Sequence, residues 1–250
     1  MQRRYSAKMS MDKQTFEVIK LLLSAFAGAF FAFIFIWISD RIKTRKEVQK
    51  NNIRALNKIQ FICNNNYSTL NTTLYSINEI IRVFNEAREQ SQDPFSANRL
   101  DKIILDQDLL LDLSNIDFIN DYFSFTRIIE KHNNDVDNLN HFHESMKMAR
   151  LTGVISSDNY ITNLGRFERN LKLFNRFVID LMNQTESIIA KSRVLLKDEA
   201  TFIKKLFKNT SKGYKKNFDK KYESELVLLR SEMKMVREKS KKDIDKVLNK

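Results

Sequence analysis

Histidine is the side chain best suited to chemistry in this sequence, and two of the three histidines stand close together as His141-Phe142-His143. Neutral imidazoles bind metal ions, but residues two apart on a helix point to nearly opposite faces, so these two cannot hold one ion. The sequence also lacks a cysteine pair, a His-Glu-x-x-His motif, an acidic calcium-binding loop, a glycine-rich phosphate loop and a Gly-x-Ser-x-Gly elbow. We therefore expect no metal site and no cofactor.

The third histidine ends the segment Arg127-Ile-Ile-Glu-Lys-His132. An arginine followed a few residues later by a histidine, on a helix of an all-α domain, resembles the motif of HEPN ribonucleases. The resemblance is confined to this segment, and it implies that His132 and Arg127 polarise a 2′-hydroxyl and stabilise the phosphate. Ile128 departs from the pattern, because such families commonly have a polar residue after the arginine.

His132 also lies on an apolar stripe with Val136, Leu139 and Met146, a spacing that places one face of a helix against a core. The same residue is therefore interpreted in two ways, as a packed histidine in a protein that is not an enzyme or as a catalytic residue of a membrane-tethered ribonuclease. The first is our leading hypothesis and the second is the alternative.

An apolar segment precedes these residues. The 19 residues from Leu21 to Ser39 carry no charge, and about 20 residues of helix cover the roughly 30 Å of a bilayer's hydrocarbon core. Trp37 lies near one end, where an indole favours the interface. A cleaved signal peptide fits less well, because its apolar region is shorter and ends at small residues. We predict a single transmembrane helix over residues 16–39, behind a basic tail of residues 1–15.

Basic residues flank this span on both sides and are more numerous after it. Seven lysines and arginines fall within 20 residues after the span, against five before it. The positive-inside rule then places the C-terminal side in the cytoplasm. Cys63 is the only cysteine and gives no sign of an oxidising compartment. We therefore expect a single-pass protein of the plasma (inner) membrane, with the bulk of its chain cytoplasmic.

Small residues recur every four positions along the span. Ser24, Gly28 and Ala32 form one row, and Ala25 and Ala29 form a second row beside it. Small residues at this spacing let transmembrane helices approach closely, so this face is predicted to support a homo-oligomer. No charged or polar side chain lines the middle of the span, which disfavours a ready-made ion channel.

The chain after the span is predicted to be all-α. The whole sequence has one proline and four glycines in 250 residues, and the apolar residues after the span step by three and four. One apolar stripe per helix is typical of bundles and coiled coils, so we expect an elongated antiparallel helical bundle over 40–210 and a basic C-terminal helix over 211–250. Its segments are expected at 40–90, 97–112, 115–150 and 159–208, with breaks at Pro94, 112–115, Gly153 and Gly213. Many Asn, Ser and Thr residues occur within 64–73 and are poor helix formers, so packing must hold that helix.

Both ends of the chain are basic. Residues 1–58 and 197–250 carry an excess of lysine and arginine, whereas the middle of the chain is slightly acidic. Basic segments of this kind are attracted to the anionic inner leaflet. The stretch after Ala200 also combines apolar and basic side chains, an interfacial-helix pattern. Its candidate membrane-surface residues are Phe202, Ile203, Lys204, Lys205, Leu206, Phe207 and Lys208.

The leading hypothesis is a membrane-anchored, self-associating helical-bundle protein, not an enzyme, that acts as a partner-binding scaffold or sensor or as a membrane-acting effector. The expected partners are the lipid bilayer, further copies of the chain and another protein. Nucleic-acid binding through the basic C-terminus is electrostatically feasible, but acidic residues interleave with the lysines there and weaken that case.

Overall fold

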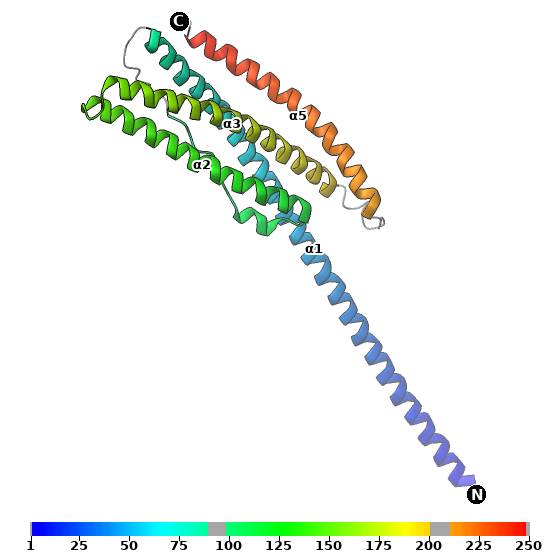
Figure 1. The fold of residues 1–250 in the computed structure, drawn as a ribbon. Coiled ribbons are helices and arrows are strands. Elements are labelled where there is room, and N and C mark those ends of the chain that lie inside the picture. The colour runs from blue at the N-terminus through cyan, green and yellow to red at the C-terminus, as the bar shows by residue number, and fades with distance from the viewer. Residues whose placement is uncertain (1, 90–98, 201–210, 249–250) are drawn as a thin grey trace. The chain divides into compact units, whose positions relative to one another are not determined.

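The computed structural model describes residues 2–89, 99–200 and 211–248 (Figure 1). The described residues form four α-helices and one 3-10 helix, and no strand occurs among them. The all-α prediction is therefore confirmed for this part of the chain. The elements are α1 (Gln2–Glu89), η1 (Asp108–Asp112), α2 (Ile116–Leu151), α3 (Ser157–Ala200) and α5 (Ser211–Leu248).

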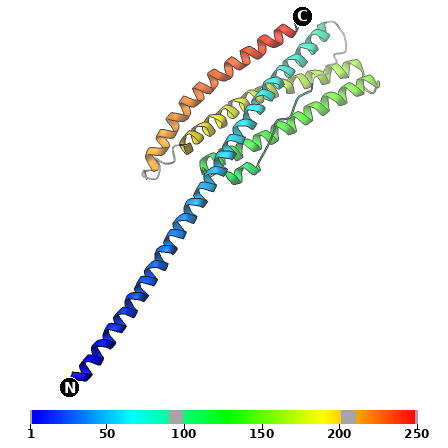
Figure 2. The same ribbon diagram turned by 180° about the vertical axis from the view of Figure 1, so that it is seen from behind.

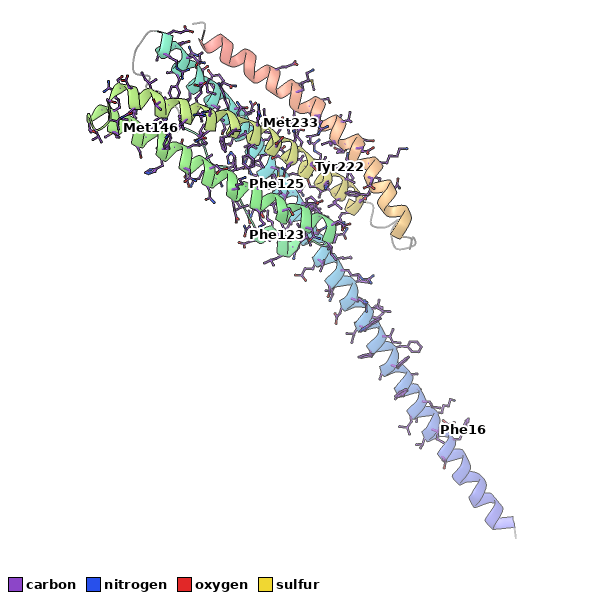
Figure 3. The ribbon with its side chains drawn as sticks, viewed as in Figure 1. Phe16, Phe123, Phe125, Met146, Tyr222 and Met233 are labelled. Atoms are coloured by element: carbon purple, nitrogen blue, oxygen red, sulfur yellow. The ribbon has the colours of Figure 1, made fainter. Side chains whose placement is uncertain are left out.

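The chain divides into two compact units, Met1–Lys50 and Asn51–Lys250, and α1 contributes to both. In the first unit, none of the described side chains of residues 15–50 is buried. Figure 3 shows these side chains, among them Phe16, standing out from the helix. By length and composition, α1 is the one helix among the described residues that could cross a membrane.

In the second unit, the later part of α1 packs along α3 in antiparallel order. The Asn52 amide near the start of this part donates to the Glu199 carboxylate at 3.2 Å, and the Phe84 ring near its end lies 6.1 Å from the Phe167 ring. The apolar spacing that predicts a helix here is also the spacing of its buried face. Buried residues on this face, three, four or seven positions apart, are Leu56, Cys63, Tyr67, Leu70, Ile77 and Phe84.

Helix α3 contacts both α2 and α5, as both views of the ribbon show (Figures 1 and 2). The His143 ring of α2 stacks on the Phe167 ring of α3 with centroids 5.1 Å apart. Nearer the start of α2, Asp121 pairs with Lys191 of α3 at 2.6 Å. These two contacts show that α2 and α3 also run in opposite directions.

The contact between α3 and α5 combines apolar and charged side chains. Leu229 of α5 is buried, and Tyr222 and Met233, labelled in Figure 3, are partly buried against the core. Carboxylates that are themselves almost fully buried are each paired with a basic side chain across this interface, as buried charges require. The pairs are Glu186–Arg230 at 3.3 Å, Glu225–Lys197 at 2.5 Å and Asp198–Lys221 at 2.6 Å.

Two of the predicted breaks have clear local causes. Asn115 caps α2, because its side chain accepts a hydrogen bond from the Phe118 backbone N–H at 2.8 Å. At the other end of α2, Gly153 has φ 72°, a left-handed conformation that glycine adopts without strain. The N–H groups of this turn bond back to carbonyls in the last turn of α2 at 2.9 and 3.1 Å, which satisfies the helix end.

The segment predicted over 97–112 differs from expectation. Within its described part only η1 is helical, and residues 99–107 have no regular secondary structure. Asparagine side chains of α1 and α2 bind the backbone of this segment and replace the hydrogen bonds that a helix would make. Gly213, predicted as a break, lies inside α5 close to its start, and Pro94 lies outside the described residues.

Candidate protein-binding site

The small residues predicted to form an association face lie on α1 and are exposed. A spacing of four places Ser24, Gly28 and Ala32 on one side of the helix, with Ala25 and Ala29 beside them. A Cβ atom added at Gly28 would meet no atom within 4 Å among the described residues. The candidate membrane-surface residues, Phe202 to Lys208, lie outside the described part of the chain.

Arg127 and His132 do not share a surface. Both lie on α2, where five residues turn two side chains roughly 140° away from each other. Arg127 is exposed, and its guanidinium carbon lies 5.8 Å from the centre of the Phe123 ring, which is labelled in Figure 3. His132 is 0% exposed. The two residues therefore do not form a solvent-accessible pair that could bind a phosphate.

The His132 ring packs among aromatic side chains of α3. Its centroid lies 5.3 Å from that of Phe174 and 6.4 Å from that of Phe177. Its Nδ1 lies 3.3 Å from the Asn133 side-chain oxygen, whereas Nε2 has no hydrogen-bond partner in the described part of the chain. Burial lowers the pKa of His132, because the charged imidazolium would lose its hydration there. This is the environment of a packed histidine.

The other two histidines differ from each other. His143 lies between the Phe84 and Phe167 rings, with centroid distances of 5.9 and 5.1 Å, and burial lowers its pKa as well. His141 is exposed. Among the described residues, no group of three or more His, Cys, Asp or Glu side chains is arranged to hold a metal ion.

A different set of polar residues converges on residues 99–107, here named the strap. Three asparagines each bind one strap residue twice, accepting its backbone N–H through Oδ1 and donating through Nδ2 to its carbonyl oxygen. Paired residues of an antiparallel sheet exchange hydrogen bonds in the same way. The pairs are Asn140–Leu100 at 3.0 and 2.8 Å, Asn133–Ile103 at 3.0 and 3.0 Å, and Asn66–Ile104 at 2.7 and 2.7 Å.

The spacing of the asparagines on α2 matches the spacing of the strap residues they bind. Asn133 and Asn140 are seven residues apart, which is about 10.5 Å along a helix axis. Leu100 and Ile103 are three residues apart, which is about 10 Å along an extended chain. The asparagines therefore hold the strap extended and antiparallel to α2, while Asn66 binds it from α1.

Side chains of the strap add contacts of two kinds. Leu100 and Ile103 are buried in the core, whereas Ile104 is 52% exposed. Lys102 pairs with Asp137 of α2 at 2.7 Å. Leu105 is half-buried and also packs against the core. The strap therefore presents Leu100, Ile103 and Leu105 to the core, with the cation of Lys102 before Ile103.

The end of the strap is fixed through Asp106. Its carboxylate pairs with Lys58 of α1 at 2.8 Å, and this hydrogen bond raises the pKa of Lys58. Its backbone carbonyl accepts a hydrogen bond from the Tyr122 hydroxyl at 3.1 Å. Beyond the strap, the Asn52 side chain accepts the Ser114 backbone N–H at 3.0 Å. The side chains that bind this connection thus come from α1 and α2.

Sequence reasoning did not identify these asparagines as site residues. Around Asn66 it noted only poor helix formers, although this residue precedes a buried member of the apolar stripe, Tyr67. Asn133 and Asn140 have the seven-residue spacing of side chains on one helix face. Asn66 is buried, and Asn133 and Asn140 are half-buried. Asparagines at such positions are a usable signal, because an amide removed from water needs a hydrogen-bonding partner.

The chemistry of this arrangement is recognition of a polypeptide backbone. An asparagine amide offers a donor and an acceptor together and does not titrate, so it matches the N–H and C=O of one residue. Asp137 and Lys58 add charges of opposite sign on the two helices that flank the strap. The chain matches no protein-family model, no curated protein and no solved structure.

Proposed function

We propose that this chain is a single-pass protein of the plasma (inner) membrane, and that residues 40–250 form a cytoplasmic scaffold that binds a protein partner. The observation that carries the proposal is the contrast along α1. Its uncharged residues 21–39 are unburied, with Phe26 72% exposed, whereas its apolar stripe after Asn51 is buried. An exposed apolar helix of this length is unfavourable in water and favourable in a bilayer.

The scaffold is an elongated antiparallel bundle in this proposal. Its support is the order of contacts along α3, whose partners on α1, α2 and α5 each run in the direction opposite to α3. Helices packed in this way bury one stripe each and leave their outer faces free for a partner.

Self-association through the span is part of the proposal. The motive is the row Ser24, Gly28 and Ala32, where small side chains permit close van der Waals contact between helices.

The proposed role is binding and not catalysis. The HEPN-like alternative requires His132 and Arg127 to act together on RNA. His132 is enclosed by Phe174 and Phe177, and Arg127 is exposed on another face of α2. The backbone-binding asparagines of the strap, by contrast, are a recognition device that is already assembled.

Alkaline extraction of membranes tests the anchor. The full-length chain is expected to stay in the membrane pellet, and Phe30→Arg/Phe33→Arg is expected to be released, because each arginine costs about 2.5–3.5 kcal/mol at a span centre. Phe61→Arg is the matched control, since Phe61 is on the same helix and 65% exposed, but lies beyond the span. Release of the unmodified chain, or equal release of Phe61→Arg and the double variant, would contradict the proposal.

A further inference from the structure

We propose that the groove between α1 and α2, which the strap fills in this structure, binds an extended segment of a partner protein. This inference rests on the proposed function, in which the domain binds a protein partner, and it names the chemistry of that partner. The strap acts as an internal competitor for the same groove.

The groove binds its occupant mainly through hydrogen bonds to the backbone. Asn66, Asn133 and Asn140 satisfy both the N–H and the C=O of the residue each one faces. Any non-proline residue presents the same two groups in an extended chain. Main-chain hydrogen bonds of this kind give affinity in peptide recognition, while pockets for selected side chains give specificity.

The side-chain contacts define which segment fits. The buried positions of Leu100 and Ile103 require apolar residues three apart. Asp137 pairs with Lys102, the residue before Ile103. Lys58 pairs with Asp106, three residues after Ile103. Leu105 also packs against the core, whereas Asp101 and Ile104 are exposed. The partner segment is therefore extended and reads, in order, apolar, any residue, basic, apolar, any residue, apolar, acidic.

The strap is bound in a way that permits exchange. Leu100 and Ile103 are the fully buried side chains between Arg99 and Gln107, Leu105 is half-buried against the core, and the other strap side chains are exposed or half-buried. The Lys102–Asp137 pair is more than half exposed on both sides, and such pairs stabilise little. Segments with few buried apolar contacts open at lower free energy than the whole domain.

Covalent attachment explains why the strap occupies the groove in the isolated chain. A tethered segment competes at an effective concentration on the order of millimolar, so a free peptide of equal intrinsic affinity binds weakly while the strap is intact. Weakening the strap without changing the asparagines removes this competition. The proposal therefore predicts that strap variants gain affinity for a peptide that carries the strap sequence.

A fluorescent peptide of residues 99–109 is the probe, titrated into the full-length chain in detergent micelles. We expect the variant Leu100→Ser/Ile103→Ser to bind this peptide at least about tenfold more tightly than the unmodified chain, because its strap no longer buries two apolar side chains in the groove. Lys102→Glu changes no buried side chain and places a second carboxylate beside Asp137, so it is also expected to raise the affinity for the peptide. It replaces the first variant in the experiment if that variant loses its helical circular dichroism.

Two controls isolate the asparagine contacts. A peptide N-methylated at the positions of Leu100 and Ile103 keeps every side chain but loses the two donated N–H groups, so its binding is expected to fall at least about tenfold. Adding Asn133→Leu to a folded strap variant is expected to weaken the unmethylated peptide similarly. Unchanged affinity in folded strap variants, or equal binding of the methylated peptide, would overturn the proposal.

The competing occupant of the groove is the strap of a second copy of the chain. Size-exclusion chromatography in the same micelles distinguishes it, because a strap exchanged between copies gives a dimer that Asn133→Leu disrupts, and this result would overturn the assignment to a partner protein. Failure of peptide binding leaves the membrane extraction result unchanged, so the two proposals fail separately.

Discussion

Asn133 and Ile103 exchange two hydrogen bonds of 3.0 Å each, although 30 residues separate them along the chain. Replacing Asn133 with leucine leaves the N–H and C=O of Ile103 unpaired next to the core. Each unpaired group costs about 1–3 kcal/mol, so Asn133→Leu is expected to lower the free energy of unfolding by about 2–6 kcal/mol. Chemical denaturation monitored by circular dichroism measures this change.

Asn134 is the matched control for that substitution. It is the next residue on α2 and is exposed, so Asn134→Leu removes the same amide without removing a partner of the strap. Its effect is expected to stay within about 0.5 kcal/mol, as for most surface substitutions. Equal losses for the two variants would show that the asparagine–strap contact does not stabilise the domain.

His132 distinguishes the packed interpretation from the ribonuclease alternative. Because its ring is buried against Phe174, His132→Ala leaves a cavity and is expected to lower the free energy of unfolding by about 2–3 kcal/mol. His132→Leu fills much of the space and removes Nε2, which has no hydrogen-bond partner among the described residues, so its loss of stability is expected to be smaller. If His132→Ala abolishes RNA cleavage or toxicity without lowering the melting temperature, the packed interpretation is wrong.

The buried histidines make stability depend on pH. Burial lowers the pKa of His132 and of His143, so the unfolded chain binds protons near pH 6.5 while the folded chain does so only at lower pH. Protons therefore favour unfolding, and the free energy of unfolding is expected to fall as the pH decreases from about 7 to about 5. The neighbouring carboxylates of Asp135 and Glu144 oppose the shift, and Lys147 adds to that of His143.

The double variant His132→Leu/His143→Leu is expected to flatten this pH dependence. Glu168 does not interfere, because its pKa is lowered by Lys172 and Arg88 and its contribution is lost only at more acid pH. Urea denaturation at several pH values provides the comparison. A slope that persists unchanged in the double variant would mean that other groups cause it.

Gly28 tests the association of the spans. Lipid tails are as apolar as leucine, so close van der Waals contact must hold two such helices together. Gly28→Leu would separate them and remove contacts worth ~0.1–0.2 kcal/mol each along the row, and Ser24→Leu or Ala32→Leu is expected to act less strongly. Cross-linking in membranes measures the oligomer, with Phe30→Leu, off the row, as the control. Equal amounts of cross-linked oligomer in the unmodified chain and in Gly28→Leu would show that any assembly does not use the face formed by Ser24, Gly28 and Ala32.

Much of the helical structure was predictable because its causes are local. The apolar spacing that predicts a helix over 159–208 is interrupted by the polar residues Thr185 and Ser192, and both are buried. Thr185 and Ser192 donate hydrogen bonds to carbonyls of their own helix at 2.8 Å each, so the stripe continues through them. Glycine at 153 and asparagine at 115 likewise act on the residues beside them.

The strap was not predictable in this way because its causes are distant. Ile103 and Ile104 have the apolar character of a packed helix, and local spacing favours one. The groups that hold their backbone extended, Asn133 and Asn66, lie 30 and 38 residues away. Helix propensity is a weak preference that such tertiary hydrogen bonds override.

Cysteine accessibility tests the central claim, that α1 crosses the membrane once and leaves residues 40–250 in the cytoplasm. Cys63, the one cysteine of the sequence, is buried, and burial raises the pKa of its thiol to about 12, so it reacts slowly. A membrane-impermeant maleimide applied to intact spheroplasts is expected to label Gln2→Cys, and to label Lys250→Cys only after the membrane is dissolved. Labelling of Lys250→Cys in intact spheroplasts, with Gln2→Cys protected, would contradict the account.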